Sequence, residues 1–350
     1  MQTIRSTQKE LWNTIVKSFS NWDIYYLNEY AQSLMIHGDG QPILLYFEST
    51  DAKMAYVMME NDLSEQEWFK GQIYKGEYLD WTTPYGYGGP LFEGNVTEDW
   101  LIKCINQVKE YAKEKHIISQ FFRFHPLLQN QSGMESVCNI LPEKETIYID
   151  TISEKQIYKN MTPNNRNMVR KAKKLGVQIS YDNGERLDEF EYIYNKTMEM
   201  HHADKYYSFQ PKYFQYLKER MKKNMIFFYA EYEGNIISSS IFFYNEHYMH
   251  YHLSGTLPEY RKMASANLLL TEAAYWASSQ GIQKLHLGGG VSQEDSLFQF
   301  KKHFNRNGEL KFYIGSNIFD EQKFKQLVDI RGKKDQYFDK NQKYMILYRA

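Results

Sequence analysis

Hydrophobic and polar positions follow two alternating periods along the first half of the chain. Residues 42–49 and 53–60 are apolar runs joined by a turn at Thr50–Asp51, which predicts a pair of strands. Within 98–116, apolar residues recur at positions 101, 105 and 108 among charged ones, the spacing of an amphipathic helix. Residues 117–126 then predict a strand that ends at a proline.

The second half repeats this order of elements. Residues 225–255 predict a strand, a Glu-Gly-Asn turn and two more strands. A helix over 265–281 stops at a glycine, and a strand follows over 282–290. Each half thus has paired strands, a segment of glycines and aromatics, a helix of about four turns and a strand that carries a histidine. The even alternation of a doubly wound sheet is missing, so we expect an α+β fold with mixed sheets flanked by helices, built twice.

The domain boundary is expected near Asp150–Glu154, after the apolar run that ends at Asp150. The first domain then comprises residues 1–150 and the second 151–317. The last residues, 343–350, form one more apolar run that predicts a strand. A strand needs a partner, so we expect residues 318–350 to return to the first domain.

Composition restricts the class of protein. The 350 residues, 42% of them hydrophobic, suffice for the cores of two domains of ~100–200 residues. A net charge of −1 gives no overall attraction for nucleic acid or membrane, so an anionic partner needs a local basic patch. Cys104 and Cys138 match no metal-ligand spacing, so no metal is expected, and so few cysteines suit a reducing compartment. With no apolar leader at the N-terminus and no membrane span, we expect a cytoplasmic protein.

Three consecutive glycines, Gly288, Gly289 and Gly290, end the predicted strand over 282–290. They suit a close approach of backbone to a ligand, or a donation of N–H groups to an anion, but also a tight turn. Asp295 beyond them either caps the next helix or acts on a substrate amine. His286, and His252 on the preceding strand, are catalytic candidates whose alternative is a hydrogen-bonded place in the core.

Residues 155–174 hold seven basic and no acidic side chains. Thr162 can cap a helix that has Pro163 at its first position. On that helix one face carries Arg166, Arg170, Lys173 and Lys174. This face suits a pyrophosphate or a tRNA backbone, and its alternative is a solvated surface.

Two segments of the first half are candidates for substrate contact. In residues 84–89 glycines separate Tyr85 and Tyr87, which predicts a loop whose exposed rings wall a sugar or peptide, unless they pack against the first domain. Arg123, two residues before His125 on the same strand face, could bind phosphate or pair with a buried carboxylate.

Several of these motifs together resemble the FemABX-like acyltransferases. The resemblance lies in residues 166–177, 252–281, 285–290 and 298–304 of the second half, and in 81–92 and 121–130 of the first. It implies two GNAT-like (acyl-CoA N-acyltransferase) domains in tandem, of a compact type because no coiled-coil arm is present. It also implies transfer of an acyl or aminoacyl group to an amine, with Lys301 of the Phe300-Lys301-Phe304 element at the reaction centre. Lys301 would stabilise negative charge on the carbonyl oxygen.

The resemblance leaves the acyl donor open. In acetyl-CoA enzymes of this fold a glycine-containing loop binds pyrophosphate, and here Arg261 to Ala266 has alanine at position 264, where the first glycine belongs. This favours aminoacyl-tRNA over acetyl-CoA, with no tightly bound cofactor. We expect a nucleotide- or lipid-linked cell-envelope precursor in a cleft between the domains. The alternatives are an acetyl-CoA-dependent N-acetyltransferase acting on an amino sugar of a surface polysaccharide, and a binding module without turnover.

Overall fold

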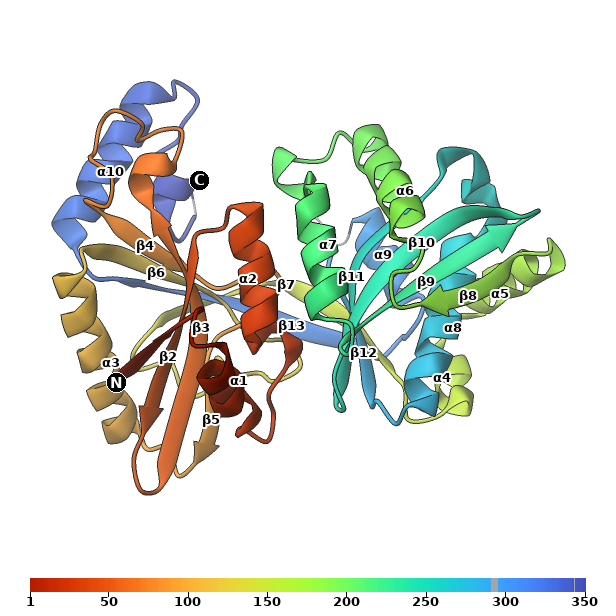
Figure 1. Ribbon diagram of the computed structural model, residues 1–350, viewed down its shortest axis with the longest axis horizontal. Helices are drawn as coiled ribbons and strands as arrows, with labels where there is room; N and C mark the ends of the chain where they lie inside the picture. Colours follow the sequence, from red (N-terminus) through yellow and green to blue (C-terminus); the bar gives the residue numbers. More distant parts are fainter. Residues whose placement is uncertain (291–294, 343) are drawn as a thin grey trace. The chain divides into compact units, whose positions relative to one another are not determined.

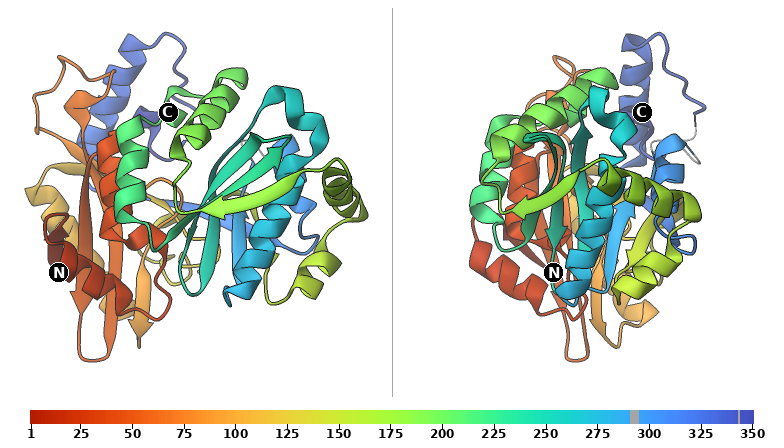
Figure 2. Two further views of the ribbon diagram at one scale, coloured as in Figure 1. Left: turned by 45° about the vertical axis from the view of Figure 1, so that its right-hand side comes forward. Right: turned by 90° about the vertical axis from the view of Figure 1, so that its right-hand side faces the viewer.

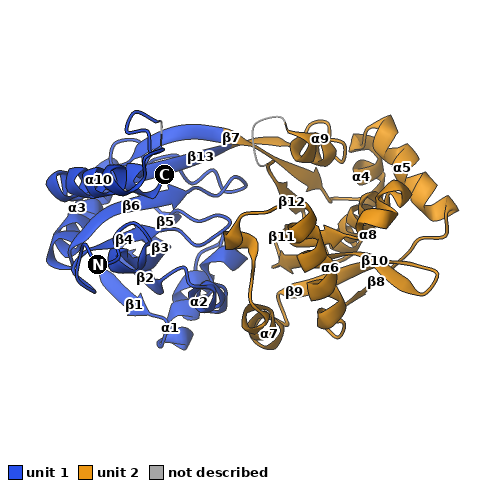
Figure 3. Ribbon diagram, turned by 90° about the horizontal axis from the view of Figure 1, so that it is seen from above, with its two compact units in different colours: residues 1–143, 312–350 blue, residues 144–311 orange. Residues whose placement is uncertain are grey.

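The chain folds into two compact units, coloured separately in Figure 3. The computed structural model describes residues 1–290, 295–342 and 344–350. Unit 1 comprises residues 1–143 and 312–350, and unit 2 comprises residues 144–311. The chain passes from one unit to the other within two long strands, β7 (Asn139–Asp150) and β13 (Glu309–Ile318).

Unit 1 is built on a mixed sheet whose strand order is β1-β2-β3-β4-β6-β13, with β5 also paired to β3. The pairs are antiparallel except β4 with β6. Besides β13, its strands are β1 (Gln2–Arg5), β2 (Gln41–Glu48), β3 (Ala52–Asp62), β4 (Leu79–Thr82), β5 (Leu91–Gly94) and β6 (Ile117–Arg123). Its α-helices are α1 (Lys9–Lys17), α2 (Asn28–His37), α3 (Glu98–Glu114) and α10 (Glu321–Lys334). The strand pair predicted over 42–49 and 53–60 corresponds to β2 and β3, and the helix predicted over 98–116 corresponds to α3.

The end of the chain differs from the prediction. Among residues 344–350 there is a short 3-10 helix, Leu347–Arg349, and no strand; Lys343 lies outside the described residues. Tyr348 donates a hydrogen bond to Asp80 at 2.9 Å, and the guanidinium of Arg349 binds both oxygens of the same carboxylate. Side-chain bonds to one buried acid therefore hold this segment in unit 1, where the apolar run had suggested backbone pairing.

In unit 2 the strand order is β7-β12-β11-β10-β9-β8. Its strands after β7 are β8 (Gln178–Asp182), β9 (Met225–Tyr232), β10 (Asn235–Tyr244), β11 (Tyr248–Thr256) and β12 (Lys284–Gly288). Only β11 and β12 run parallel within this described set. Helices α6 (Leu187–Met200) and α7 (Pro211–Arg220) cover one face, and α8 (Ser265–Ser279) covers the other, with α4 (Glu154–Asn160) and α5 (Pro163–Lys174) beside it (Figures 1 and 2). The last helix is α9 (Ser296–Lys302).

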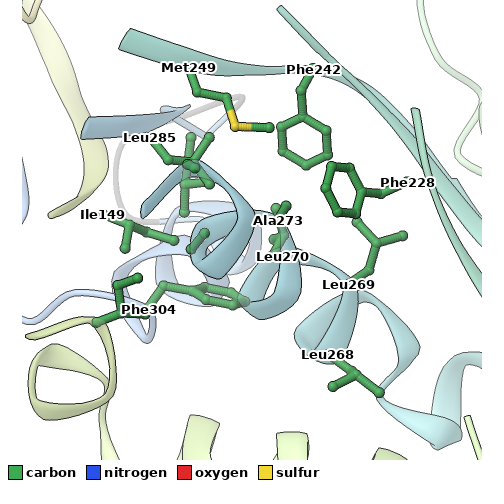
Figure 4. Close-up of a cluster of buried hydrophobic side chains, with 14 of the residues drawn as sticks. Ile149, Phe228, Phe242, Met249, Leu268, Leu269, Leu270, Ala273, Leu285 and Phe304 are labelled. Carbon is green, nitrogen blue, oxygen red and sulfur yellow. The ribbon is translucent and has the colours of Figure 1, made fainter. Parts of the chain in front are cut away.

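The core of unit 2 lies between α8 and its sheet (Figure 4). Alternate residues of the strands, such as Phe228, Phe242 and Leu285, point toward Leu269 and Ala273 of α8. Phe304, just after α9, is buried in the same cluster. Burial of these side chains fixes where α9 begins and ends relative to β12, and α9 carries the lysine singled out by the sequence.

The chain passes between the two units after residues 143 and 311, whereas the sequence analysis placed the domain boundaries after residues 150 and 317. They fall inside β7 and β13, strands whose continuous backbone serves both units, so no linker marks them in the sequence. No helix among the described residues is long and apolar enough to cross a membrane.

Candidate functional site

The three glycines after β12 are required for three different physical reasons. Gly288 has φ +72°, a left-handed conformation that favours glycine. A side chain on Gly289 would place its Cβ 2.8 Å from the carbonyl oxygen of Glu145 on β7. A side chain on Gly290 would overlap the carboxylate of Asp295. The loop therefore lies tightly between β7 and the start of α9, as the tight-turn interpretation required.

Lys301, on α9, is held by this glycine loop. Its Nζ donates a hydrogen bond to the carbonyl of Gly289 at 2.6 Å, and only 7% of the residue is exposed. Burial lowers the pKa of Lys301 from 10.5 to about 7; the charge of Asp295 opposes this shift and that of Lys144 adds to it. At neutral pH the ammonium is therefore close to losing its proton, which is unusual for a lysine.

Two further side chains that the sequence did not single out lie at the same place. Lys144, on β7, donates from Nζ to the carbonyl of Gly290 at 3.0 Å. Tyr251, on β11, has its ring centre 6.0 Å from Nζ of Lys301, and its hydroxyl donates to Ser254 at 2.5 Å. Two lysine Nζ groups thus bind one backbone loop, and an aromatic ring lies beside one of them.

Asp295 is the N-cap of α9 and accepts a hydrogen bond from the backbone N–H of Phe298 at 2.7 Å. Capping was one of its two expected roles, and the same carboxylate lies against Gly290. Lys302, the next residue after Lys301, is 40% exposed at its side chain and forms an ion pair with Glu309. The two adjacent lysines therefore have different environments, which makes Lys302 a natural control for Lys301.

The two histidines proposed as candidates each have a hydrogen-bond partner in unit 2. His286 is 1% exposed and its Nε2 lies 2.9 Å from the hydroxyl of Thr146. His252 has its Nε2 2.9 Å from the hydroxyl of Tyr213. Burial, together with the charge of His250, lowers the pKa of His252 to about 3, so its imidazole is neutral at physiological pH. Both contacts fit a hydrogen-bonded place in the core.

The basic helix is α5, with Thr162 as its N-cap and Pro163 in its first turn, as predicted. The guanidinium of Arg166 lies 5.1 Å from the ring centre of Tyr158, and Arg170 donates to Asn167 at 2.5 Å. Lys174 is exposed.

One member of this face is neutralised from another helix. Lys173 forms an ion pair with Glu272 of α8 at 2.8 Å. The basic run therefore has a compensating acid that its own sequence does not contain. Leu175, the residue at the end of the helix, is 44% exposed.

Helices α5 and α9 meet directly. The backbone N–H of Thr162 donates to the carbonyl of His303 at 3.0 Å, and the Thr162 hydroxyl lies 3.2 Å from Nδ1 of the same residue. His303 follows Lys301 by two positions, and Arg166 lies one turn inside α5 from Thr162. The predicted phosphate-binding helix and the predicted reaction-centre lysine are thus joined within one unit.

The remaining candidates belong to unit 1. Tyr87 is 9% exposed and packs edge-on against Tyr25 and Phe312, so the exposed ring that we expected here is absent. Tyr85 is partly buried, and its carbonyl accepts a hydrogen bond from Tyr30. Packing against the first domain was the alternative for this loop.

Arg123 holds the same loop in place. Its Nε donates to the carbonyl of Gly86 at 2.9 Å, and its guanidinium lies 5.1 Å from the ring centre of Phe312. His125, on the same strand face, pairs with Asp23 at 2.8 Å in a buried contact. Arg123 therefore supports backbone, where phosphate or a buried carboxylate had been expected.

Ala264, the departure from the glycine pattern, immediately precedes α8. It has φ +57° and ψ +31°, the left-handed conformation that a glycine adopts readily and alanine adopts at a cost of about 1–2 kcal/mol. It is 8% exposed and belongs to the core cluster of unit 2. Because its methyl group packs in the core, the loop keeps a glycine-like turn, and this position does not by itself separate the two donors.

Comparisons with known proteins bear on the fold and the class of domain. Residues 160–302 match a family model described as an acetyltransferase (GNAT) domain. No curated protein matches the sequence significantly. A crystal structure of FemX is 12% identical, covers 93% of this chain and 99% of its own, and has a TM-score of 0.66.

Two other solved structures are similar over most of their length. The structure of L-PGS from Bacillus licheniformis is 12% identical, covers 92% of this chain and 96% of its own, and has a TM-score of 0.54. A tandem GNAT protein from the clavulanic acid biosynthesis pathway is 7% identical, with coverages of 91% and 97% and a TM-score of 0.53.

These likenesses confirm the predicted fold class and the resemblance at the level of fold: the chain has a tandem GNAT-type fold similar to that of FemX. The family match identifies an acyltransferase domain of the GNAT type within unit 2. That domain contains Lys301, the glycine loop and α5.

Proposed function

We propose that the protein transfers an aminoacyl or other acyl group from aminoacyl-tRNA to an amine of a nucleotide- or lipid-linked cell-envelope precursor, with Lys301 at the reaction centre. The observation that carries this proposal is the buried ammonium of Lys301 on the carbonyl of Gly289, within the GNAT-type domain. A buried lysine with a lowered pKa is costly to keep, and such groups concentrate at functional sites.

In the proposed reaction the amine nitrogen of the acceptor attacks the carbonyl carbon of the aminoacyl ester. The C–N bond forms, the C–O bond to the tRNA ribose breaks, and the proton lost by the amine goes to the leaving ribose oxygen, which becomes a hydroxyl. Negative charge develops on the carbonyl oxygen, where the ammonium of Lys301 supplies a charged hydrogen-bond donor. A donor of this kind typically contributes a factor of about 10²–10³ in rate.

The basic face of α5 supports a phosphate-bearing substrate at the same site. Arg166 and Arg170 belong to the helix whose N-cap, Thr162, contacts His303 at the end of α9. Guanidinium groups bind phosphate oxygens with paired hydrogen bonds. A nucleotide-linked acceptor and a tRNA both supply such oxygens, and FemX and L-PGS, whose folds are similar, are consistent with an envelope-related substrate.

The alternative function is an acetyl-CoA-dependent N-acetyltransferase that acts on an amino sugar of a surface polysaccharide. Ala264 is compatible with it, because the left-handed turn before α8 is retained and leaves the helix N-terminus in place for a phosphate. The family match to an acetyltransferase domain also favours it.

The two donors are separated by one experiment with labelled substrates. The protein is incubated with total tRNA charged with ¹⁴C-labelled amino acids, or with ¹⁴C-acetyl-CoA, and a panel of UDP-linked amino sugars and UDP-linked muramyl peptides. We expect label on an acceptor from charged tRNA, and its loss after RNase treatment. Transfer from acetyl-CoA that survives RNase would establish the alternative, and binding of a UDP-linked compound without any transfer would support a binding module.

A double substitution that removes two positive charges tests the role of α5 in substrate binding. Replacing Arg166 and Arg170 together with Gln should raise KM for the phosphorylated substrate and reduce the slope of log KM against log salt by about two. The matched control removes Lys109 and Lys113, two exposed lysines on α3 of unit 1. Equal effects of the two pairs would contradict a specific role for α5.

A further inference from the structure

Two lysines from different parts of unit 2 bind consecutive carbonyls of one glycine loop. Lys301 of α9 donates a hydrogen bond to the carbonyl of Gly289, and Lys144 of β7 donates one to the carbonyl of Gly290. Like charges that share so small a region repel each other, since two unit charges a few Å apart interact by about 1–4 kcal/mol in surroundings between water and protein. Such a pair persists only if something offsets the repulsion.

We propose that Lys144 is a positioning residue for Lys301 in the transfer reaction, which holds the glycine loop at Gly290 and acts with its own charge on the ammonium of Lys301. This inference rests on the proposed function for its purpose, and on the two carbonyl contacts for its geometry. Lys144 binds the loop at Gly290 and Lys301 binds it at Gly289. The proposed effect of Lys144 therefore combines support of the loop with repulsion between the two ammonium charges.

The charged and titratable groups around Lys301 are few among the described residues. Asp295 at the start of α9 favours its ammonium form, Lys144 on β7 disfavours it, and Tyr251 on β11 presents a ring. Lys302 on the same helix is paired with Glu309. Burial and the charge of Lys144 both lower the pKa of Lys301, so removing the charge of Lys144 leaves burial as the opposing effect and this pKa should rise.

The two lysines on the glycine loop let the site respond to an anionic substrate. With both lysines charged, the loop region carries a net positive charge next to one carboxylate. A phosphate or a developing oxyanion at this place would be attracted by both ammonium groups and would favour the charged form of Lys301. In the free protein, the charge of Lys144 thus favours the deprotonated form of Lys301. A bound anion would attract both ammonium groups and favour the charged form.

The test is a pH titration of lysine Nζ resonances by NMR in the full chain labelled with ¹⁵N-lysine, which needs no substrate. The Lys301 signal is assigned by its loss in Lys301→Met. In Lys144→Met its midpoint should rise by on the order of one pH unit. Lys144→Gln should do the same while it retains a donor for the Gly290 carbonyl, which covers the case in which the Met variant fails to fold.

Two control variants test whether the charge at position 144 shifts the Lys301 midpoint. One keeps that charge, and the other removes a charge at a different position. Lys144→Arg should leave the Lys301 midpoint unchanged. Lys284→Met should also leave it unchanged, because it removes a lysine of β12 that lies over the ring of Tyr148 on β7. A Lys301 midpoint that is the same in wild type and in Lys144→Gln overturns the inference. In the transfer assay, the pH at which activity falls should move upward with the midpoint in Lys144→Gln and stay in Lys144→Arg. A shifted midpoint without transfer from any donor would refute the proposed function and keep the coupling between the lysines.

Discussion

Replacing Lys301 with Met should make the protein more stable at pH 6 while it removes activity. The difference between the ordinary pKa of 10.5 and about 7 in the fold corresponds to about 5 kcal/mol by which burial disfavours the charged lysine. Methionine has a similar length and no charge, so it avoids this cost. It also leaves the carbonyl of Gly289 without its donor, which costs about 1–3 kcal/mol. The net gain expected at pH 6 is about 2–4 kcal/mol.

The sign of the pH dependence follows from the direction of the shift. Because the pKa of Lys301 is lower in the folded chain than in the unfolded chain, the unfolded state binds more protons between pH 7 and 10.5. This residue's contribution to stability therefore increases with pH in that range, by about 1.4 kcal/mol per pH unit. The stability advantage of Lys301→Met should shrink by about 3 kcal/mol between pH 6 and 9.

The assay is urea unfolding of the wild type and the variant at pH 6, 7, 8 and 9, followed by circular dichroism. Only the difference between the two proteins is interpreted, because other groups titrate equally in both. Lys302→Met is the matched control: its side chain is 40% exposed and forms a surface ion pair with Glu309, so the substitution should change stability by less than about 1 kcal/mol with little pH dependence. A Lys301→Met variant that is less stable at pH 6, or whose advantage is constant with pH, would refute the reasoning about Lys301.

Three other substitutions test the structure around the site and in unit 1. Ala264→Gly should raise the free energy of unfolding by about 1 kcal/mol, because it relieves the left-handed conformation, and calorimetry would measure it; a loss of stability would show that the methyl group's packing matters more. Gly289→Ala should lower kcat at least tenfold with a folded far-UV spectrum, since its Cβ would meet the carbonyl of Glu145 and displace the loop; an unchanged kcat would mean that the loop position is not critical. Asp80→Asn should destabilise the protein by about 3–5 kcal/mol through the loss of a buried partner for Arg349, visible as a lower Tm, and an unchanged Tm would contradict the importance of this pair.

Local periodicity was sufficient to predict the elements that depend on their own sequence. The strand pair β2–β3, helix α3 and the run from β9 to β12 follow directly from alternating or helical apolar spacing. Strand β13 was missed, since what makes it a strand is its antiparallel pairing with β6, more than 180 residues earlier in the chain. The strand predicted over 343–350 was wrong because the apolar run there resembles a strand. In the structure, side-chain hydrogen bonds to Asp80 hold the end of this segment.

The candidate site was predictable only where a motif carried it. Lys301 could be found from the Phe300-Lys301-Phe304 element, but Lys144 is flanked by Glu143 and Glu145 and resembles an exposed charged segment. Its place at the glycine loop is set by the pairing of β7 with β12, which no local pattern encodes.

Tyr87 shows the opposite error. Its glycine-rich surroundings suggested an exposed loop, but hydrogen bonds from Arg123 to Gly86 and to Thr83 tie that loop to β6. Glycines there allow close packing of backbone against aromatic rings, as at Gly86, where a Cβ would overlap Tyr25. Burial of this kind depends on partners distant in sequence.

The most direct test is the single-turnover rate of acyl transfer by wild type, Lys301→Met and Lys302→Met, with the donor and acceptor that the labelling experiment identifies. We predict that Lys301→Met lowers the rate by about 10²–10³ without preventing donor binding, whereas Lys302→Met stays within about twofold of wild type. A Lys301→Met protein that transfers the acyl group as fast as wild type would contradict the account.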